Sequence, residues 1–395
     1  MLADLRELQR RTGDERGAQR LCWSAGWREA RSYLDELLDE IGLEPQTDEA
    51  GNLWSYLEGE REPALVLGSH IDSVPDGGWL DGALGVMAAA GVLRAWAQSG
   101  TRPPRTLALA DFADEEGARF GRSLFGSSTV AGSLEAADLA GATDAEGRRA
   151  AEVLAECGVD LNRMAAASAR LERVGSYLEL HIEQGPVLDS QGAPLTAVTG
   201  CAGIERLHLE FGGQAAHAGT TPMWMRQDAG LAAAETALAV ERIATEEGGV
   251  GTAGRLDMHP GIVTAVPGGA VLAVDLRHGE AAQLTRMLER VREAAEETAR
   301  ERGCELGEES IWRIEPVAFD RELVDLAADV AGGRRLASGA LHDAAAIAGV
   351  RPAAMLFVPS IGGVSHAREE DTAEADLRAG IEAFARLANA VASRD

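Results

Sequence analysis

Four glycine-rich segments of the chain together supply histidines and carboxylates, the residue types that hold divalent metals and move protons. Imidazole nitrogens and carboxylate oxygens both ligate metals such as zinc, and a nearby carboxylate can handle protons. Glycine permits tight turns and close approach of the backbone. This pattern favours a divalent-metal site. The segments are GSHIDSVPDGGWLDGALGV (68–86), DFADEEGARFG (111–121), HIEQGPVL (181–188) and SIGGVSHAREED (360–371).

The carboxylates Glu115 and Glu116 follow an apolar run that ends at Phe112. Two neighbouring carboxylates at a strand end point in different directions, so one can bind a metal while the other handles protons. In the first segment, His70 follows another apolar run and Asp81 stands just before a glycine-initiated helix. A strand-end histidine with a nearby carboxylate suits a divalent metal.

Each of these signals is weak when it is taken alone. A single histidine after a strand, such as His181 or His366, is more often a hydrogen-bonded structural residue than a metal ligand. Neighbouring acidic residues are usually solvated. The metal site is favoured because three histidines and at least two carboxylates occur in four segments of the same kind.

The elements that must position these residues follow from the apolar periodicity. Residues 82–97 are typical of a buried, alanine-rich helix, and most of the first 45 residues and of 135–171 are expected to be helical. Strands that alternate with helices predict an α/β sheet, whose ligands bind at the strand ends. Four short apolar runs are typical of strands: 65–67, 106–112, 177–182 and 355–358.

Residues 206–317 show a different order of elements, which is strand, helix, strand, strand, helix, strand. This βαββαβ order is the ferredoxin-like plan. We therefore predict a two-domain α/β protein, in which residues 1–205 and 318–395 form one domain and residues 206–317 are inserted as the second. The expected elements of the insert are strand 206–211, helix 228–245, strands 253–258 and 270–277, helix 281–302 and strand 310–317.

The charge and the residue usage exclude several classes of protein. A formal net charge of −27 argues against nucleic acid or an anionic membrane as a partner, because phosphate binding needs a basic surface. All 37 basic residues are arginine. The lack of lysine excludes Schiff-base chemistry, a pyridoxal phosphate anchor, a Walker A lysine and a carbamylated-lysine metal bridge.

The cysteines and the N-terminal residues indicate the expected compartment. The four cysteines lie far apart without a Cys-x-x-Cys pair, and residues 1–20 are charged throughout. The longest uncharged run of small residues stops at Arg94 and is too short to span a bilayer. We therefore expect a cytoplasmic protein with no membrane partner.

Together with GQAAHAGTTPM (213–223), the four segments closely resemble the N-carbamoyl-L-amino acid hydrolase, allantoate amidohydrolase and beta-ureidopropionase branch of the M20 metallopeptidase-like family. The resemblance covers about residues 20–395. A histidine in HIEQG, where aminopeptidase-like relatives carry a carboxylate ligand, points to this branch. The implied fold is a zinc-peptidase-like α/β catalytic domain with an inserted ferredoxin-like lid and dimerisation domain.

The resemblance also implies the metal centre and its ligands. Two divalent metal ions are expected, and a mixed nitrogen and oxygen ligand set accepts zinc, manganese, cobalt or nickel. Glu115 would be the general base. The implied ligands are His70, the bridging Asp81, Glu116, His181 and His366.

The resemblance assigns further residues to substrate binding. Gln184 and Arg277 correspond to substrate-binding residues, with Arg277 pairing a substrate carboxylate. His217 would reach the partner's active site in a homodimer and stabilise the oxyanion. Two positions depart from the family pattern: Thr264 stands in place of an asparagine, and Leu341 in place of a glycine in SGALHDA. A threonine cannot reproduce both hydrogen bonds of an amide, so substrate recognition can differ.

The expected function is that of a two-metal amidohydrolase. It would cleave the C–N bond of linear N-carbamoyl (ureido) amino acids to give the amino acid, carbon dioxide and ammonia. The alternatives within the family are an allantoate amidohydrolase or an N-acyl-amino acid hydrolase. A catalytically silent binding protein is the competing class, and it is disfavoured because no ligand and no base is lost.

Overall fold

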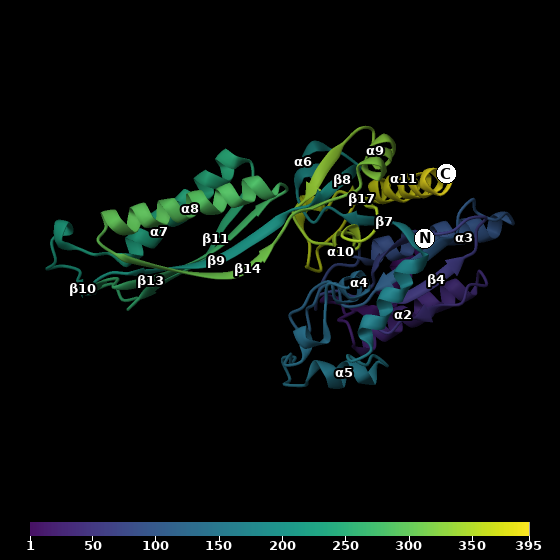
Figure 1. Ribbon diagram of the computed structural model, residues 1–395, viewed down its shortest axis with the longest axis horizontal. Coiled ribbons are helices and arrows are strands. Elements are labelled where there is room, and N and C mark those ends of the chain that lie inside the picture. The colour runs from purple at the N-terminus through teal and green to yellow at the C-terminus, as the bar shows by residue number, and fades with distance from the viewer. Residues whose placement is uncertain (395) are drawn as a thin grey trace. The chain divides into compact units, whose positions relative to one another are not determined.

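The computed structural model describes residues 1–394, and in it the chain folds into two compact units (Figure 1). Unit 1 consists of Met1–Thr199 and the described residues from Ala318 onward, and unit 2 consists of Gly200–Val317. Unit 2 begins ahead of residue 206, because its first strand already starts at Gly203.

Unit 1 is built on a mixed nine-stranded sheet with the path β15-β8-β17-β7-β5-β6-β4-β3, and β16 pairs with β8. The four central strands, β17, β7, β5 and β6, run parallel and are buried almost throughout, which explains their apolar runs. The predicted α/β sheet is thereby confirmed. The strands are β3 (Gln46–Thr47), β4 (Leu53–Leu57), β5 (Ala64–His70), β6 (Leu107–Phe112), β7 (Val174–Ile182), β8 (Thr196–Cys201), β15 (Val317–Ala318), β16 (Arg335–Ser338) and β17 (Ala353–Val358).

The helices of unit 1 pack around this sheet. They are α1 (Leu2–Thr12), α2 (Ala25–Asp39), α3 (Ala83–Ser99), α4 (Phe125–Ala131), α5 (Ala150–Glu156), α6 (Val187–Gln191), α9 (Arg321–Val330), α10 (Asp343–Ala348) and α11 (Glu374–Ala392), with 3-10 turns η1 (Ala136–Leu139), η2 (Met164–Arg173) and η4 (Ile361–Gly363). Small residues let α3 lie close to the sheet: a Cβ at Gly85 would collide with the Leu180 carbonyl.

Two segments of unit 1 that were predicted to be helical are interrupted in the structure. The first 45 residues do not form one helical stretch, because a hairpin of β1 (Gly13–Asp14) and β2 (Gly17–Ala18) separates α1 from α2. Gly17 has a φ of 133°, which only glycine adopts readily. Residues 135–171 likewise divide into η1, α5 and η2, because Gly147 and Gly158 take positive φ between them.

Unit 2 is an antiparallel sheet of order β11-β13-β9-β14 with two helices, which is the strand order of a ferredoxin-like fold. Apolar residues of β9 and β13, such as Leu209 and Leu272, form its core with α7 and α8. The elements are β9 (Gly203–Gly212), β10 (Ala216–His217), η3 (Met223–Met225), α7 (Ala229–Glu247), β11 (Val250–His259), β12 (Ala265–Val266), β13 (Gly269–His278), α8 (Ala281–Glu301) and β14 (Glu305–Ile314).

The last strand of the insert differs from the expectation. Strand 310–317 was predicted, but β14 spans Glu305–Ile314 and Val317 belongs to β15 of the unit 1 sheet. Pro316 carries no N–H to continue the ladder, so the chain leaves the unit 2 sheet there. Among the described residues, no helix of either unit is both long and apolar enough to cross a membrane.

Candidate metal centre

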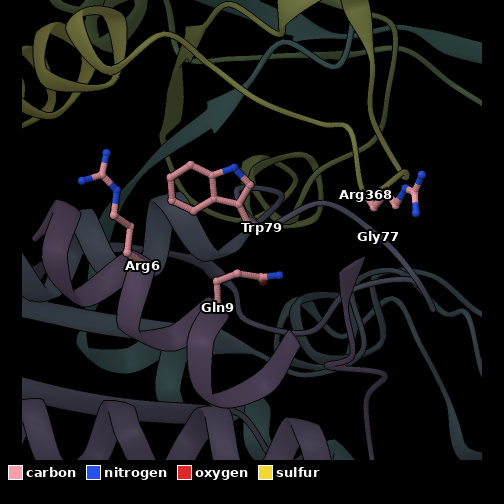
Figure 2. A pocket seen from close by; sticks show the side chains of 5 residues that line it. All are labelled: Arg6, Gln9, Gly77, Trp79 and Arg368. Carbon is pink, nitrogen blue, oxygen red and sulfur yellow. The ribbon is translucent and has the colours of Figure 1, made fainter. Parts of the chain in front are cut away.

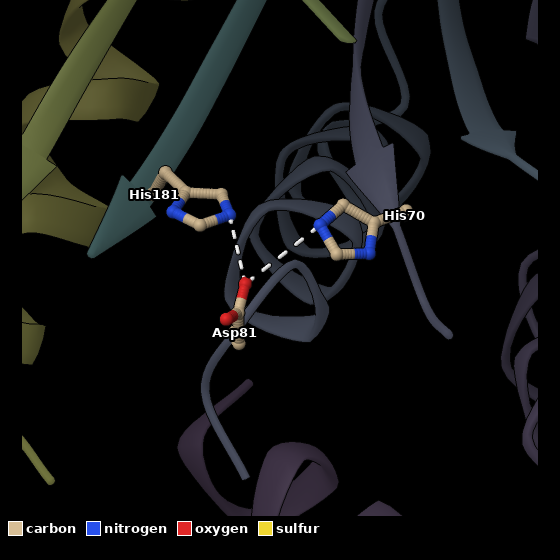
Figure 3. Close-up of side chains that lie close together, drawn as sticks. All are labelled: His70, Asp81 and His181. Carbon is tan, nitrogen blue, oxygen red and sulfur yellow. Dashed lines mark ion pairs between the residues drawn. The ribbon is translucent and has the colours of Figure 1, made fainter. Parts of the chain in front are cut away.

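The carboxyl ends of the four central strands of unit 1 bring the predicted ligands together. Asp81 lies in the middle of them, in the loop that ends at α3. Its Oδ1 is 3.2 Å from His181 Nε2 and 3.8 Å from His70 Nε2, and Figure 3 shows the carboxylate between the two rings. All three side chains are buried. They form one group of atoms that could hold a metal ion.

A second group shares Asp81. Its other oxygen, Oδ2, is 3.3 Å from His366 Nε2, which in turn is 3.5 Å from Glu116 Oε2. Asp81, Glu116 and His366 again offer ligand atoms within 4.8 Å of one another. One carboxylate that faces a different group with each oxygen is the arrangement expected of a ligand that bridges two metals.

The hydrogen bonds of the two buried histidines engage Nδ1 of each ring and leave Nε2 available to bind a metal. His181 Nδ1 lies 2.9 Å from the Ile182 carbonyl, and His70 Nδ1 lies 3.2 Å from the Asp72 carbonyl. A ring nitrogen next to a carbonyl oxygen must donate, so Nε2 is the nitrogen of each ring that faces Asp81 and that a metal could bind in place of a proton. Such outer hydrogen bonds fix the orientation of histidine ligands in metal sites.

The loop before α3 can approach this closely because residue 82 is glycine. Gly82 has a φ of 62°, and a Cβ at this position would collide with the His70 ring. The Gly82 N–H also donates to His181 Nε2 at 3.3 Å. A side chain at residue 82 would therefore displace both His70 and the loop that holds Asp81.

Glu115 and Glu116 point to different places, as their adjacency predicts. Glu115 Oε2 lies 3.7 Å from His70 Nε2, whereas Glu116 is on the His366 side. Their backbone N–H groups donate to the two carboxylate oxygens of Asp72, at 3.3 and 3.4 Å. Asp72 therefore fixes the turn after β6.

The electrostatics of the cluster suit the binding of a cation. Burial, followed by the negative charge of Asp81, raises the pKa of Glu116 to about 7. Burial also raises the pKa of Glu115 well above its usual range, although His70 partly opposes the shift. The Oε1 atom of Glu116 is buried without a hydrogen-bond partner. Buried carboxylates of this kind are stabilised when a cation binds them.

Gln184, expected to bind substrate, lies at the centre itself. Its Nε2 donates to Asp81 Oδ2 at 2.8 Å and to Ser365 Oγ at 3.2 Å, and it lies 3.2 Å from His366 Nε2. The residue has a φ of 57°, which turns the chain sharply after His181. Its amide thus points at the carboxylate oxygen that faces the second group.

The other three residues expected to bind substrate are in unit 2. His217 is exposed on β10, which pairs with β12, and the Ala218 N–H donates to the Thr264 carbonyl at 2.9 Å. His217 Nδ1 accepts from the Gly219 N–H at 3.1 Å, so Nε2 carries the proton and is a donor. Arg277, on β13, donates from Nε to Asp275 Oδ1 at 2.8 Å.

Two carboxylates that hold the loops of the candidate centre, Asp72 and Glu370, are not among the predicted site residues. Asp72 stands two residues after His70 and Glu370 four residues after His366, so both were inside the segments singled out. Their nearness to a histidine was the available signal. Both bind backbone N–H groups of other loops, which a residue pattern does not show.

Comparison with known proteins identifies the family of the chain. A model of peptidase family M20/M25/M40 matches residues 66–390. The chain belongs to this family. It is similar to an N-carbamoyl-L-amino acid amidohydrolase of Geobacillus stearothermophilus, with 37% identity over 93% of this chain and 91% of the relative. A ureidoglycolate hydrolase of Arabidopsis thaliana is 35% identical over 89% of this chain and 77% of the relative.

A solved structure is similar to this chain over its whole length. The hydantoinase/carbamoylase family amidase of Burkholderia multivorans superposes with a TM-score of 0.91 and 30% identity, covering 100% of this chain and 97% of that one. The predicted family and the mixed α/β fold are confirmed. The chain is an amidohydrolase of this family, a class that acts on carbon–nitrogen bonds other than peptide bonds.

Proposed function

We propose that this chain is a two-metal amidohydrolase that cleaves linear N-carbamoyl (ureido) amino acids. The observation that carries the proposal is the pair of ligand groups that share Asp81, with Glu115 beside them. The similarity to an N-carbamoyl-L-amino acid amidohydrolase supports the choice of substrate class.

The residues fit two divalent cations. His70, Asp81 and His181 would hold one, and Asp81, Glu116 and His366 the other. The fit rests on the Nε2 atoms of His70 and His181, which face Asp81 while Nδ1 of each ring is held by a carbonyl, and on the partnerless Glu116 Oε1. When bound, such cations lower the pKa of a water molecule and polarise a carbonyl oxygen. Imidazole with carboxylate accepts zinc, manganese, cobalt or nickel.

Glu115 would move the proton. It takes one proton from the attacking water and delivers it to the departing nitrogen. The water oxygen bonds to the carbamoyl carbon, and the bond from that carbon to the amino acid nitrogen breaks. The carbamic acid that remains decomposes to carbon dioxide and ammonia, so one substrate and one water give the amino acid and both gases.

The residues of unit 2 would recognise the substrate. The Nε2–H of His217 is a donor suited to a developing oxyanion, and the Arg277 guanidinium suits a substrate carboxylate. Because His217 is exposed, we propose that the chain works as a homodimer in which His217 completes the site of the other subunit. We further propose a cytoplasmic location.

A second substrate class is suggested by one residue that departs from the family pattern and by one similar protein. Thr264 replaces the asparagine of the family pattern, and a ureidoglycolate hydrolase is 35% identical to the chain. Ureidoglycolate and allantoate are also ureido acids, so the same chemistry would cleave them. The hydroxyl at residue 264 is where the preference among these substrates would be set.

The test is an ammonia-release assay on metal-loaded protein. The panel contains N-carbamoyl amino acids of both configurations, allantoate, ureidoglycolate and N-acyl amino acids, the last being followed by release of the free amino acid. The proposal expects the highest kcat/KM for an N-carbamoyl amino acid, loss of activity with a chelator, and recovery with Mn²⁺, Co²⁺ or Zn²⁺. No turnover of any ureido acid by protein with two bound metals would refute it.

A further inference from the structure

The side chain of Glu370 connects its own loop, which supplies His366, to the loop that supplies Asp81. It is only 1% exposed. Its Oε1 accepts the backbone N–H groups of Leu80 at 3.2 Å and of Asp81 at 3.0 Å. One carboxylate oxygen thus holds the backbone of the residue that faces both ligand groups.

The other oxygen of Glu370 holds the second loop. Its Oε2 accepts the Ser365 hydroxyl at 2.9 Å and the His366 N–H at 3.3 Å. His366 has a φ of 54°, a conformation that a non-glycine residue keeps only when its surroundings enforce it. The bond from Glu370 to its N–H is one such restraint.

The loop around residue 78 is shaped to admit this carboxylate. A Cβ at Gly78 would collide with Oε1 and Cδ of Glu370, so glycine at this position leaves the space that the side chain fills. The loops are not packed together throughout. A pocket of about 260 Å³ lies there. It is lined by Gly77 and Trp79 of one loop, Arg368 of the other, and Arg6 and Gln9 of α1 (Figure 2).

A buried cation accompanies Glu370. Arg20 is fully buried, and its Nε donates to the Ile71 carbonyl at 2.8 Å, directly after His70. Burial lowers the pKa of Arg20 to about 10, and the charge of Glu370 is the strongest attraction that opposes this shift. Burial raises the pKa of Glu370, and the deprotonated carboxylate is the form that accepts four hydrogen bonds.

We propose that Glu370 is a positioning residue that sets the spacing between the two metal-binding groups by holding the loops of Asp81 and His366 with separate carboxylate oxygens. This inference rests on the proposed two-metal function and deepens it. Glu370 is not one of the proposed metal ligands, and it acts through the backbone of Asp81 and His366.

The test is Glu370→Gln in the full chain, titrated with Mn²⁺ by calorimetry after chelation. The amide oxygen can keep the Leu80 and Asp81 bonds, but its NH₂ group then meets the His366 N–H, donor against donor. We expect the binding of one Mn²⁺ to weaken by about 10- to 100-fold, as for other residues that orient metal ligands, and the binding of the other to change little. The thermal midpoint of the metal-free protein should stay close to that of the wild type.

Glu369→Gln is the matched control. Glu369 is adjacent and exposed, and it pairs with Arg368, so this variant loses the same charge without touching either loop's backbone bonds. It should bind two Mn²⁺ as the wild type does. Gly78→Ala is the second variant: it displaces the Glu370 carboxylate from both loops and should weaken both binding steps.

The possible results of this experiment distinguish a failure of this inference from a failure of the proposed function. Wild-type protein that binds no Mn²⁺ would overturn the proposed function and this inference together. Equal two-step binding by wild type and Glu370→Gln would overturn the inference alone. The same holds if Glu370→Gln weakens both steps equally together with a large fall in the thermal midpoint, since that result indicates a general structural role.

Discussion

The two units hold their candidate functional residues in opposite ways. In unit 1, His70, Asp81 and His181 are at most 2% exposed, and each is fixed by hydrogen bonds to strands or loops. In unit 2, His217 and Thr264 are exposed and are joined through strands of only two residues. The difference shows that the candidate metal centre is organised within one folded unit, whereas the proposed substrate-binding residues of unit 2 would need a further surface to enclose a substrate.

The variant expected to have the largest effect on the buried site of unit 1 is Glu115→Gln. An amide cannot take a proton from the attacking water, so we expect kcat to fall by about 10²- to 10⁴-fold. Metal content, measured by elemental analysis, should stay at the wild-type level. Near-normal kcat would show that Glu115 is not the base.

Glu116→Gln is the neighbouring control for that experiment. Glu116 faces His366, so its loss should lower the affinity for one metal ion and leave turnover recoverable at high metal concentration. If both variants lose metal equally, the separate roles of the two adjacent carboxylates are wrong.

The exposed half is tested by His217→Ala. Removal of an oxyanion donor is expected to lower kcat by about 10²- to 10³-fold. Mixing this variant with Glu115→Gln should restore about a quarter of wild-type activity after subunit exchange, because half of the dimers then carry one intact site of two. Demonstrated exchange without recovery would mean that His217 does not serve the other subunit.

Arg277→Ala should have a smaller effect, confined to binding. Loss of a charge-assisted bond to a carboxylate is expected to raise KM by about 10- to 100-fold for substrates with an α-carboxylate, with kcat little changed. Amides of the same substrates are the comparison and should be poor for both proteins. An equal rise in KM for acids and amides would argue against the carboxylate contact.

The smallest expected effect is a pH dependence of the metal-free protein. The pKa of Glu116 is raised to about 7 by burial and then by Asp81, and the pKa of His366 to about 9 by its bond to Asp81. A group with a raised pKa binds more protons in the folded state, so the stability that these two groups contribute is fully present below about pH 4.5 and is lost as pH rises to about 9. Thermal midpoints measured with chelator should decline over this range, and added Mn²⁺ should reduce the decline. A midpoint that rises across this range would contradict the shifts.

Much of unit 1 could be predicted because parallel strands are buried on both faces and end at one edge. The runs that precede His70, Glu115, His181 and His366 are readable from apolar residues alone, and the structure brings these side chains together. Glu370 could not be assigned, since its role depends on backbone groups almost 290 residues away, at Leu80 and Asp81.

The exposed part of unit 2 was harder to predict. The ladder between β10 and β12, which places His217 near Thr264, is two residues long and has no apolar period. The hairpin at 13–18 escaped prediction for a similar reason, because helical spacing on both sides of it masks a break made by two glycines. Short pairings depend on contacts distant in the chain, which local patterns do not encode.

The position of β17 has a consequence for how the protein is made. The strand nearest the end of the chain lies between β7 and β8, which are synthesised more than 150 residues earlier. Until β17 leaves the ribosome, these two strands have unpaired backbone edges that face a gap, the state in which nascent chains aggregate or recruit chaperones. His366 follows β17, so both proposed ligand groups are complete only when synthesis is nearly finished. Truncated chains should therefore be short-lived in the cell even though unit 2 is already complete in them.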